Sequence, residues 1–201
     1  MDSGAPDHHR AVPVDRTGLP RRPALDTGAG EVGVRLRRLR QERGISLSEL
    51  ARRAGVGKAT LSGLENSTRN PTLETLQAVT AELGVPLAAV LAQPPEGEPA
   101  VLRGAAVEAT LLEIFDDSTV TTELYRMRVP PGPMQTSPAH QAGVTEHITV
   151  FAGVLQAGPV AAPLLAGPGE HIHWQSDVPH IYRAYGDEEV VASLLIRYPR
   201  G

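Results

Sequence analysis

The sequence predicts two domains of different class: an all-α domain of five short helices, followed by an all-β domain built as a sandwich or small barrel. Residues 31–92 carry apolar side chains at helical spacing almost throughout. Residues 101–200 instead show alternating runs separated by Gly and Pro. Residues 93–100 lie between these regions and are rich in Pro and Glu, which is typical of a linker.

The N-terminal residues 1–30 show neither a helical nor a strand period and contain many Pro, Gly and Asp. We therefore expect them to form a disordered arm. The first helix follows from Glu31 and ends near Gly44. A second helix starts at Leu47, because Ser46 and Glu49 have the spacing of a capping box, in which each side chain bonds a free backbone N–H of the helix end.

The third helix follows a short turn, since Gly55 accepts the left-handed backbone that ends the second. It packs Leu61 and Leu64 inward. Two short helices joined by such a turn have the shape of a unit that enters a DNA groove. The side chains left on its other faces are Lys58, Ala59, Ser62, Gly63 and Asn66.

Two further helices complete the all-α domain. The fourth opens at Pro71-Thr72 and ends at Gly84, and Pro86 starts a short fifth helix. In the second domain, strand-like runs with Gly and Pro turns favour a sandwich or small barrel. These runs are residues 119–129, 146–151, 171–174 and 190–197.

The overall net charge is −4, but it is divided unevenly between the domains. Residues 31–92 hold nine Lys and Arg against six Asp and Glu, whereas residues 93–201 hold six against thirteen. Charge alone leaves two interpretations, a helical domain that faces phosphates or ordinary variation between two surfaces. Arg21 and Arg22 likewise belong either to a solvated tail or to a mobile arm that touches the DNA backbone.

Composition excludes several classes of protein. The 201 residues include no cysteine, so disulfides and cysteine-based zinc fingers are ruled out, and only histidine and carboxylate remain as metal ligands. No stretch reads as a membrane span or signal peptide. We expect a soluble, cytoplasmic protein that has no membrane partner.

Residues 33–92 resemble the lambda-repressor-like helix-turn-helix domains of the XRE type. The resemblance implies a homodimer that places the third helix in the major groove of each half-site of a double-stranded DNA operator. A helical bundle used for protein contact is the alternative. The resemblance rests on Leu50-Ala51, Gly55-Val56, Leu61-Ser62, Leu64-Glu65, Asn70-Pro71 and Leu73 in the family's spacing.

The resemblance also implies which residues meet DNA. Ser46 and Asn66 stand where the family contacts phosphates. The positions where it meets base edges are Lys58, Ala59, Ser62 and Gly63, and Lys58 can reach guanine O6 and N7 from the amino end of its helix. Arg69 is either a phosphate contact or a solvated loop residue. The complete implied set is Ser46, Lys58, Ala59, Thr60, Ser62, Gly63, Asn66 and Arg69.

Arg40 and Glu65 have a different expected role. In the family, matching positions form an ion pair that ties the first helix to the third. We therefore expect both side chains to be partly buried and not free for DNA.

Residues 101–200 resemble a cupin, a double-stranded β-barrel often fused to this kind of DNA-binding domain. Pro138 replaces the first histidine of the family's first motif. The second motif is also incomplete, with Gln175, Asp177 and Ala184 in place of Pro, Gly and Asn. The matching positions are Gly132, His140, Glu146, Gly153, Gly169 and His180.

His140, Glu146 and His180 are thus implied as three ligands of a site suited to iron, manganese or zinc. The alternative is a barrel without metal, in which these groups bond each other or an organic effector. Strand alternation points His147 outward if Glu146 points inward.

The same alternation places His171 and His173 outside and Trp174 inside. The two outer histidines form either a surface metal site or ordinary exposed polar residues.

The leading hypothesis is a transcription regulator whose barrel senses a small-molecule effector and joins subunits, with no catalytic residues. A metal-dependent cupin oxygenase or isomerase that carries a DNA-binding domain is the rival, although its ligand motif is incomplete. A protein-binding adaptor is the third hypothesis, and it requires a large exposed apolar patch.

Overall fold

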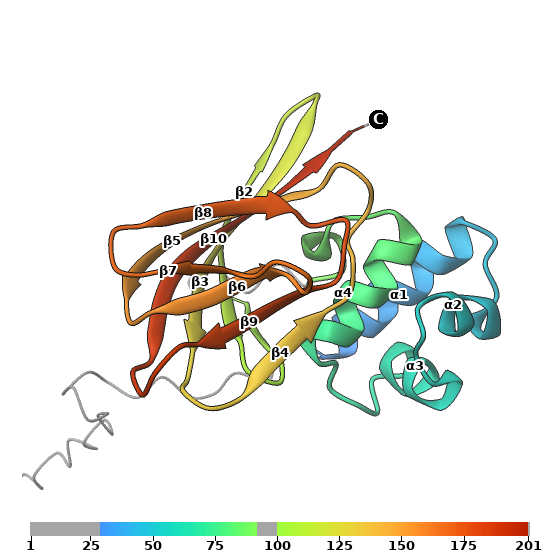
Figure 1. Ribbon diagram of the computed structural model, residues 1–201. Helices are drawn as coiled ribbons and strands as arrows, with labels where there is room; N and C mark the ends of the chain where they lie inside the picture. The colour runs from blue at the N-terminus through green and yellow to red at the C-terminus, as the bar shows by residue number, and fades with distance from the viewer. Residues whose placement is uncertain (1–28, 92–99, 201) are drawn as a thin grey trace, which may run out of the picture.

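The computed structural model describes residues 29–91 and 100–200, which form a helical domain beside a domain of β-strands (Figure 1). The predicted arm lies outside the described residues, except that residues 29 and 30 begin the first helix. The predicted linker also lies outside them, apart from Ala100.

Four α-helices occur within residues 29–91. Leu87–Ala89 form a single turn of 3-10 helix, η1, in place of the predicted fifth α-helix. A segment this short closes one turn of i→i+3 bonds, because nucleating an α-helix needs more residues. The α-helices are α1 (Ala29–Glu42), α2 (Leu47–Arg53), α3 (Lys58–Glu65) and α4 (Leu73–Leu83).

The capping box at the start of α2 is only half formed. The Ser46 hydroxyl accepts a hydrogen bond from the Glu49 backbone N–H at 3.2 Å, as predicted. The Glu49 carboxylate turns instead to Arg52 and Arg53, whose guanidinium nitrogens lie 2.8 and 2.7 Å away. Two charged donors within one helical turn compete successfully with a single backbone N–H. Gly55 ends the helix at φ +64°, as predicted.

The β domain consists of two antiparallel sheets that face each other (Figure 1). One has the order β1-β2-β3-β10-β5-β8 and the other β4-β9-β6-β7, and the described strands do not close into the predicted barrel, since each sheet keeps two edges. The strands are β1 (Val101–Arg103), β2 (Glu108–Asp116), β3 (Val120–Val129), β4 (Met134–Ser137), β5 (Thr145–Ala152), β6 (Leu155–Pro159), β7 (Leu164–Ala166), β8 (His171–Gln175), β9 (His180–Ala184) and β10 (Val190–Pro199).

Alternation along β5 and β8 decides which side chains face the space between the sheets. Glu146 and Ile148 are fully buried, whereas His147 between them is only half-buried. On β8, Trp174 is buried and both histidines of the strand are exposed. The predicted directions of these side chains are therefore confirmed.

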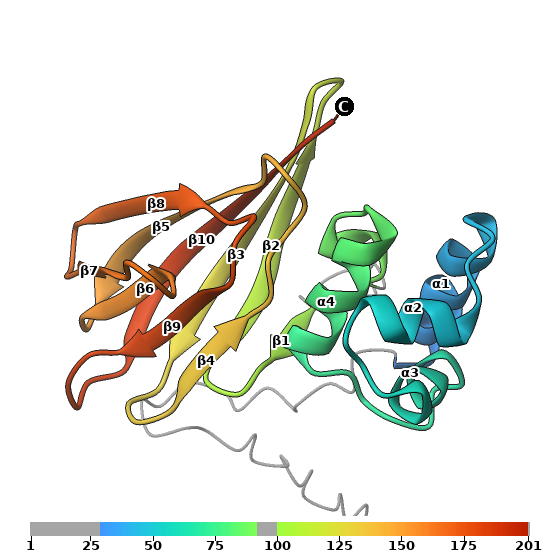
Figure 2. The ribbon, with the colours of Figure 1, turned by 45° about the vertical axis from the view of Figure 1, so that its right-hand side comes forward.

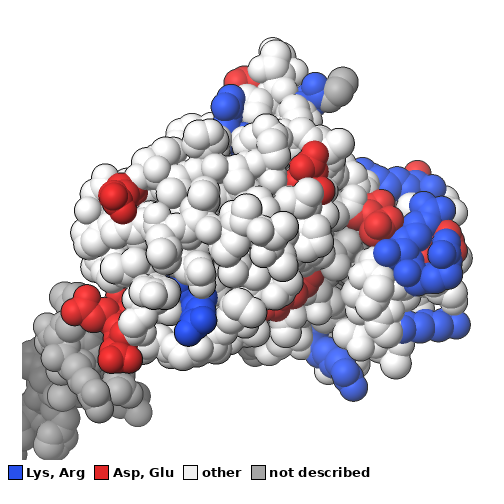
Figure 3. All heavy atoms as spheres, in the orientation of Figure 1, with Lys and Arg blue, Asp and Glu red and all other residues white. Residues whose placement is uncertain are grey.

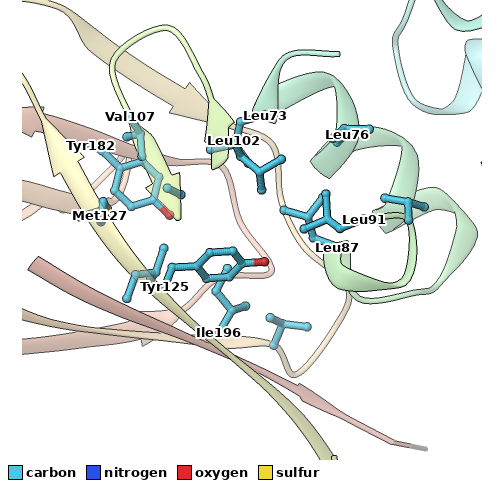
Figure 4. Packing of buried hydrophobic residues seen from close by; sticks show 14 of the residues in the cluster. Leu73, Leu76, Leu87, Leu91, Leu102, Val107, Tyr125, Met127, Tyr182 and Ile196 are labelled. Atoms are coloured by element: carbon cyan, nitrogen blue, oxygen red, sulfur yellow. The ribbon is translucent and has the colours of Figure 1, made fainter. Parts of the chain in front are cut away.

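Helix α4 and the turn η1 attach the helical domain to the sheets. The turned view places α4 between the β domain and the other three helices (Figure 2). One apolar cluster continues through both domains. Figure 4 shows Leu73 of α4 and Leu87 of η1 lying opposite Tyr125 and Ile196 of the larger sheet, with Leu102 of β1 beside Leu73. Burial of this apolar surface holds the two domains together.

Polar contacts reinforce this junction at two places. The Ala105 N–H donates to Glu74 Oε1 at 2.7 Å, and the Ala88 N–H donates to Glu123 Oε1 at 2.6 Å. No helix in the described ranges has the length and apolarity needed to cross a bilayer.

Candidate DNA-binding surface and interior polar cluster

Helix α3 turns its apolar side chains inward and the start of its reading face outward. Leu61 and Leu64 are buried against the other helices, while Lys58 and Ala59 are exposed and Thr60 is half-buried. The first turn of α3 is therefore open to a large partner.

The later part of α3 carries its own network of contacts. The Asn66 Nδ2 amide donates to Ser62 Oγ at 3.4 Å. Gly63 lies beneath the side chain of Arg69, since a Cβ built on this glycine would be 3.1 Å from Arg69 Cδ. The structure thus brings Arg69 onto α3, a contact that the sequence did not indicate. Ser46 is exposed at the start of α2.

Charge follows the division between the domains. Lys and Arg gather over the helices, while the face of the β domain seen in Figure 3 is mostly uncharged. Arg52 and Arg53 hold the pKa of Glu49 at about 2, so this carboxylate remains ionised beside them.

The Arg40 guanidinium lies between α1 and α3. Its Nε and Nη2 atoms donate to Glu65 Oε1 and Oε2 at 2.6 and 2.7 Å, and Nη1 donates to the Ile45 carbonyl at 2.9 Å. The side chains are only 11% and 5% exposed. A bidentate pair at this depth is structural, because neither charge is available to a ligand.

Gly33 allows α1 to approach α3 closely. A Cβ at this position would overlap the Leu64 carbonyl oxygen and lie 3.2 Å from Ser67 Oγ. The backbone of α3 therefore occupies the space that a side chain at position 33 would need. The helical periodicity of the sequence did not identify Gly33, because the apolar face of α1 can be predicted without it.

The structure brings His140, Glu146 and His180 together between the two sheets. His140 comes from the loop before β5, and its backbone N–H is held by the Ser176 carbonyl at 2.8 Å. Glu146 Oε1 lies 2.9 Å from His140 Nε2 and 3.1 Å from His180 Nε2. All three side chains are almost fully buried.

The protonation of this cluster follows from its contacts. Burial alone would raise the pKa of Glu146, but the two histidines hold it well below its ordinary value. Burial opposes the charge of His180, yet the adjacent carboxylate outweighs it and raises the pKa of that imidazole. The His180 Nδ1–H donates to the Val178 carbonyl at 2.9 Å, so Nε2 is the nitrogen turned toward Glu146.

Tyr182 and Trp174 complete the cluster. The Tyr182 hydroxyl donates to the second oxygen of Glu146, and the Trp174 ring lies 6.0 Å from that of His180. Trp174 Nε1 is buried without a hydrogen-bond partner among the described residues. His180 Nε2 is close to the carboxylate but outside hydrogen-bond geometry. A period of two from His180 would have placed Tyr182 on this face.

These groups fit a divalent metal as a candidate ligand set. Two imidazoles and one carboxylate have ligand atoms within 4.8 Å of one another, and this combination is typical of open transition-metal sites. The same groups also fit a small polar molecule, which could accept from the unpartnered Trp174 indole.

A second buried carboxylate connects this cluster to the helical domain. Glu123 accepts from the Tyr125 hydroxyl at 2.8 Å and from the Ala88 N–H of η1. Burial, then the Glu123 and Glu146 carboxylates, raise the pKa of Tyr198 well above its usual value. Because the Tyr198 ring also contacts His140 edge-on, it lies between the two carboxylates.

A cavity of about 580 Å³ opens at the same junction. Ala88 lines it from the helical side, and Gln141 and Tyr198 line it from the β domain. Since Gln141 adjoins His140 in the chain, the cavity lies next to the interior cluster.

A third group of titratable residues lies outside the larger sheet. His147, His171 and His173 have ligand atoms within 4.8 Å of one another. Burial and the two neighbouring imidazoles, with the Arg197 charge, lower the pKa of His147. The sequence indicated that all three point outward, but grouping them required the pairing of β5 with β8.

The chain is similar to proteins of known class. The helix-turn-helix family HTH_3 matches residues 36–90. The HTH-type transcriptional regulator SutR of Escherichia coli K12 is 33% identical over 166 residues, which cover 82% of this chain and 93% of SutR.

Solved structures resemble it as well. The crystal structure of an HTH_3 family transcriptional regulator from Vibrio cholerae has a TM-score of 0.74 at 28% identity, covering 86% of this chain and 97% of the other. The Cupin_2 domain of an XRE family transcriptional regulator from Enterobacter cloacae is also 28% identical, over 47% of this chain and 99% of that one, with a TM-score of 0.43.

Proposed function

Because the chain belongs to the XRE family of helix-turn-helix transcriptional regulators with a C-terminal cupin domain, we propose that it binds an operator as a homodimer and that its cupin domain senses a small molecule. The relatives named above are transcriptional regulators, so the comparisons do not favour the enzymatic alternative. The observation that carries the proposal is the exposed first turn of α3, on the side of the molecule away from the β-strands (Figure 2).

The proposed reading surface combines one base contact with several backbone contacts. Lys58 projects from the amino end of α3 and can donate to a guanine edge in the major groove. Ala59 and Gly63 offer no hydrogen bond from a side chain, and Gly63 is covered by Arg69. Ser46, Asn66 and Arg69 are therefore proposed to position the protein on phosphates, and DNA shape contributes to specificity.

Dimerisation is proposed through the β domain. Leu112, Ile114 and Phe115 are exposed on β2, in the hairpin with β3 that projects beyond the rest of the sheet (Figures 1 and 2). Clustered exposed apolar side chains favour a protein contact. A second copy of the chain is the proposed partner, since a two-fold operator needs two reading helices.

The proposed effector site is the interior cluster around Glu146. A divalent metal there would be held by His140, Glu146 and His180 and would act as a Lewis acid toward a small ligand. Without metal, a polar effector would use the Trp174 indole and the imidazoles directly. The contact of Glu123 with η1 offers a route by which occupancy changes the position of the helical domain. The effector must bind the two states with different affinity to shift them.

Selection from random DNA tests the first part of the proposal. We expect the full-length chain to enrich a palindromic site, to bind it as a dimer by light scattering, and to bind less tightly as salt rises. A monomer whose DNA binding does not depend on salt would contradict the proposal.

The fluorescence of Trp174 tests the second part, because this is the chain's one tryptophan. Candidate effectors and divalent metals that enter the interior cluster should change its emission in the native chain and lose that effect in Glu146→Gln. A change retained in the variant would place the ligand elsewhere.

A further inference from the structure

The outer face of the larger sheet carries three histidines on its last two strands. His147 on β5 stands directly opposite His173 on β8, and His171 opposes Thr149, two residues further along. Ring centroids are separated by 5.3 Å for His147 and His173, 5.8 Å for His147 and His171, and 6.2 Å for the two rings of β8. One histidine from β5 and two from β8 thus form a cluster of three imidazole rings.

Hydroxyl groups already support two of the three rings. Thr145 Oγ1 lies 3.2 Å from His147 Nε2, and Thr149 Oγ1 lies 3.0 Å from His171 Nδ1. A hydroxyl bonded to the ring nitrogen that does not bind the metal orients the imidazole and raises affinity. These two bonds leave His147 Nδ1 and His171 Nε2 for a metal.

We propose that His147, His171 and His173 form a binding site for a divalent transition metal, Zn²⁺ in the first place, on the outside of the β domain. Imidazole is a favoured ligand of zinc, copper and nickel. A tetrahedral zinc ion with bonds of about 2.0–2.1 Å needs nitrogens roughly 3.4 Å apart. The present ligand atoms lie within 4.8 Å of one another, and the exposed rings of β8 can rotate to close the difference. The fourth position faces solvent and stays open to water or a small anion.

This site is separate from the interior cluster. Alternation along β5 sends Glu146 to one side of the sheet and His147 to the other. On β8, the exposed His173 and the buried Trp174 are likewise neighbours that point to opposite sides of the sheet. Since β8 is the edge of its sheet, a bound metal would pin that edge to β5.

Zinc titration of the tag-free, metal-stripped full-length chain tests the site by calorimetry. The variant His171→Ala/His173→Ala should lose one bound Zn²⁺ per chain. The matched control His8→Ala/His9→Ala also removes two histidines and should keep it. Thr149→Val should retain the site but weaken it by about 10- to 100-fold, because one ring loses its orienting bond.

Two outcomes would overturn the proposal: unchanged zinc stoichiometry in His171→Ala/His173→Ala, or zinc binding that disappears only in Glu146→Gln. NMR spectra of the imidazole rings in the native chain provide a check that needs no substitution. Zn²⁺ should shift the signals of His147, His171 and His173 together, and a shift confined to His140 and His180 would assign the metal to the interior cluster.

Discussion

Single residues show how the helical domain separates its structural charges from its binding charges. Arg40 and Glu65 face each other almost without solvent, whereas Lys58 and Arg69 remain exposed. In the sequence, only the family resemblance distinguishes Arg40 from the exposed basic residues. Depth within the fold decides which of them a phosphate can reach.

We expect Arg40→Ala to lower the free energy of unfolding by about 3–5 kcal/mol, because it leaves the Glu65 carboxylate buried without a partner. Urea denaturation followed by circular dichroism measures this change. Arg38→Ala is the control, since Arg38 pairs with Glu42 at the surface and should cost about 1 kcal/mol or less. Equal stability of the two variants would show that the buried pair has no structural role.

Lys58→Ala should weaken operator binding by about 1–3 kcal/mol and relax the preference for one base pair. Arg69→Ala should weaken all DNA sequences alike and reduce the salt slope by about one. Fluorescence anisotropy on selected and scrambled sites distinguishes the two effects. Arg183→Ala removes an exposed arginine of the β domain and should change neither.

The motif spacing placed His140, Glu146 and His180 in one set, and the structure brings them together. Tyr182 and Glu123 were missed for different reasons. Tyr182 follows from alternation along β9 once His180 is known to point inward. The partner of Glu123 lies on η1 in the other domain, and no local pattern records how two domains dock.

Among the secondary-structure elements, α1 and α3 approach each other too closely to admit an added side chain at Gly33. Their backbones meet at Gly33, where the Leu64 carbonyl occupies the place of a side chain. The contact fixes the position of α3 relative to α1. It therefore also fixes how far the proposed DNA-reading face of α3 projects from the domain.

Gly33→Ala should destabilise the helical domain by about 1–3 kcal/mol, as overpacking does. The direction is informative, because alanine in a helix interior is ordinarily about 0.5–1 kcal/mol more favourable than glycine. Thermal unfolding followed at 222 nm gives the sign. The neighbouring Val34→Ala, at an exposed position of the same helix, controls for the general effect of substitution in α1. A more stable Gly33→Ala protein would show that the helices can separate at no cost.

Sequence patterns predicted the four α-helices and the strands now labelled β3, β5, β8 and β10. They failed where an element is short or depends on distant neighbours. The turn η1 was predicted as an α-helix, and the barrel was predicted to close, although pairing between strand edges depends on the twist of both sheets.

On the scale of the whole molecule, the junction between the domains combines an apolar core with a buried carboxylate. Glu123 is fully buried and bonds both a sheet tyrosine and the backbone of η1. A charge at this place is costly and its protonation is coupled to domain docking.

Stability should therefore depend on the protonation of Glu123. Burial, only partly opposed by hydrogen bonds from Ala88 and Tyr125, raises its pKa above 4.5. A raised carboxyl pKa in the folded state contributes stability below pH 4.5, and this contribution is lost as the pH rises through the folded value. The free energy of unfolding of the native chain minus that of Glu123→Gln should therefore decrease as the pH rises above 4.5.

Urea titrations at a series of pH values measure this slope. Glu113→Gln, which replaces an exposed carboxylate on β2, serves as the matched control. A difference between the native chain and Glu123→Gln that stays constant with pH would contradict the predicted linkage.

Because β10 lies between β3 and β5, the larger sheet can be completed only after β10 has been synthesised. On the ribosome, residues 29–91 emerge before the β domain, but the larger sheet remains in two parts until Val190–Pro199 have been synthesised. At 5–20 residues per second, the chain from the end of β3 to the end of β10 takes roughly 4–14 s to appear. During that interval β3, and later also β5, has an unpaired edge, so we expect chaperones to bind the β domain of the nascent chain.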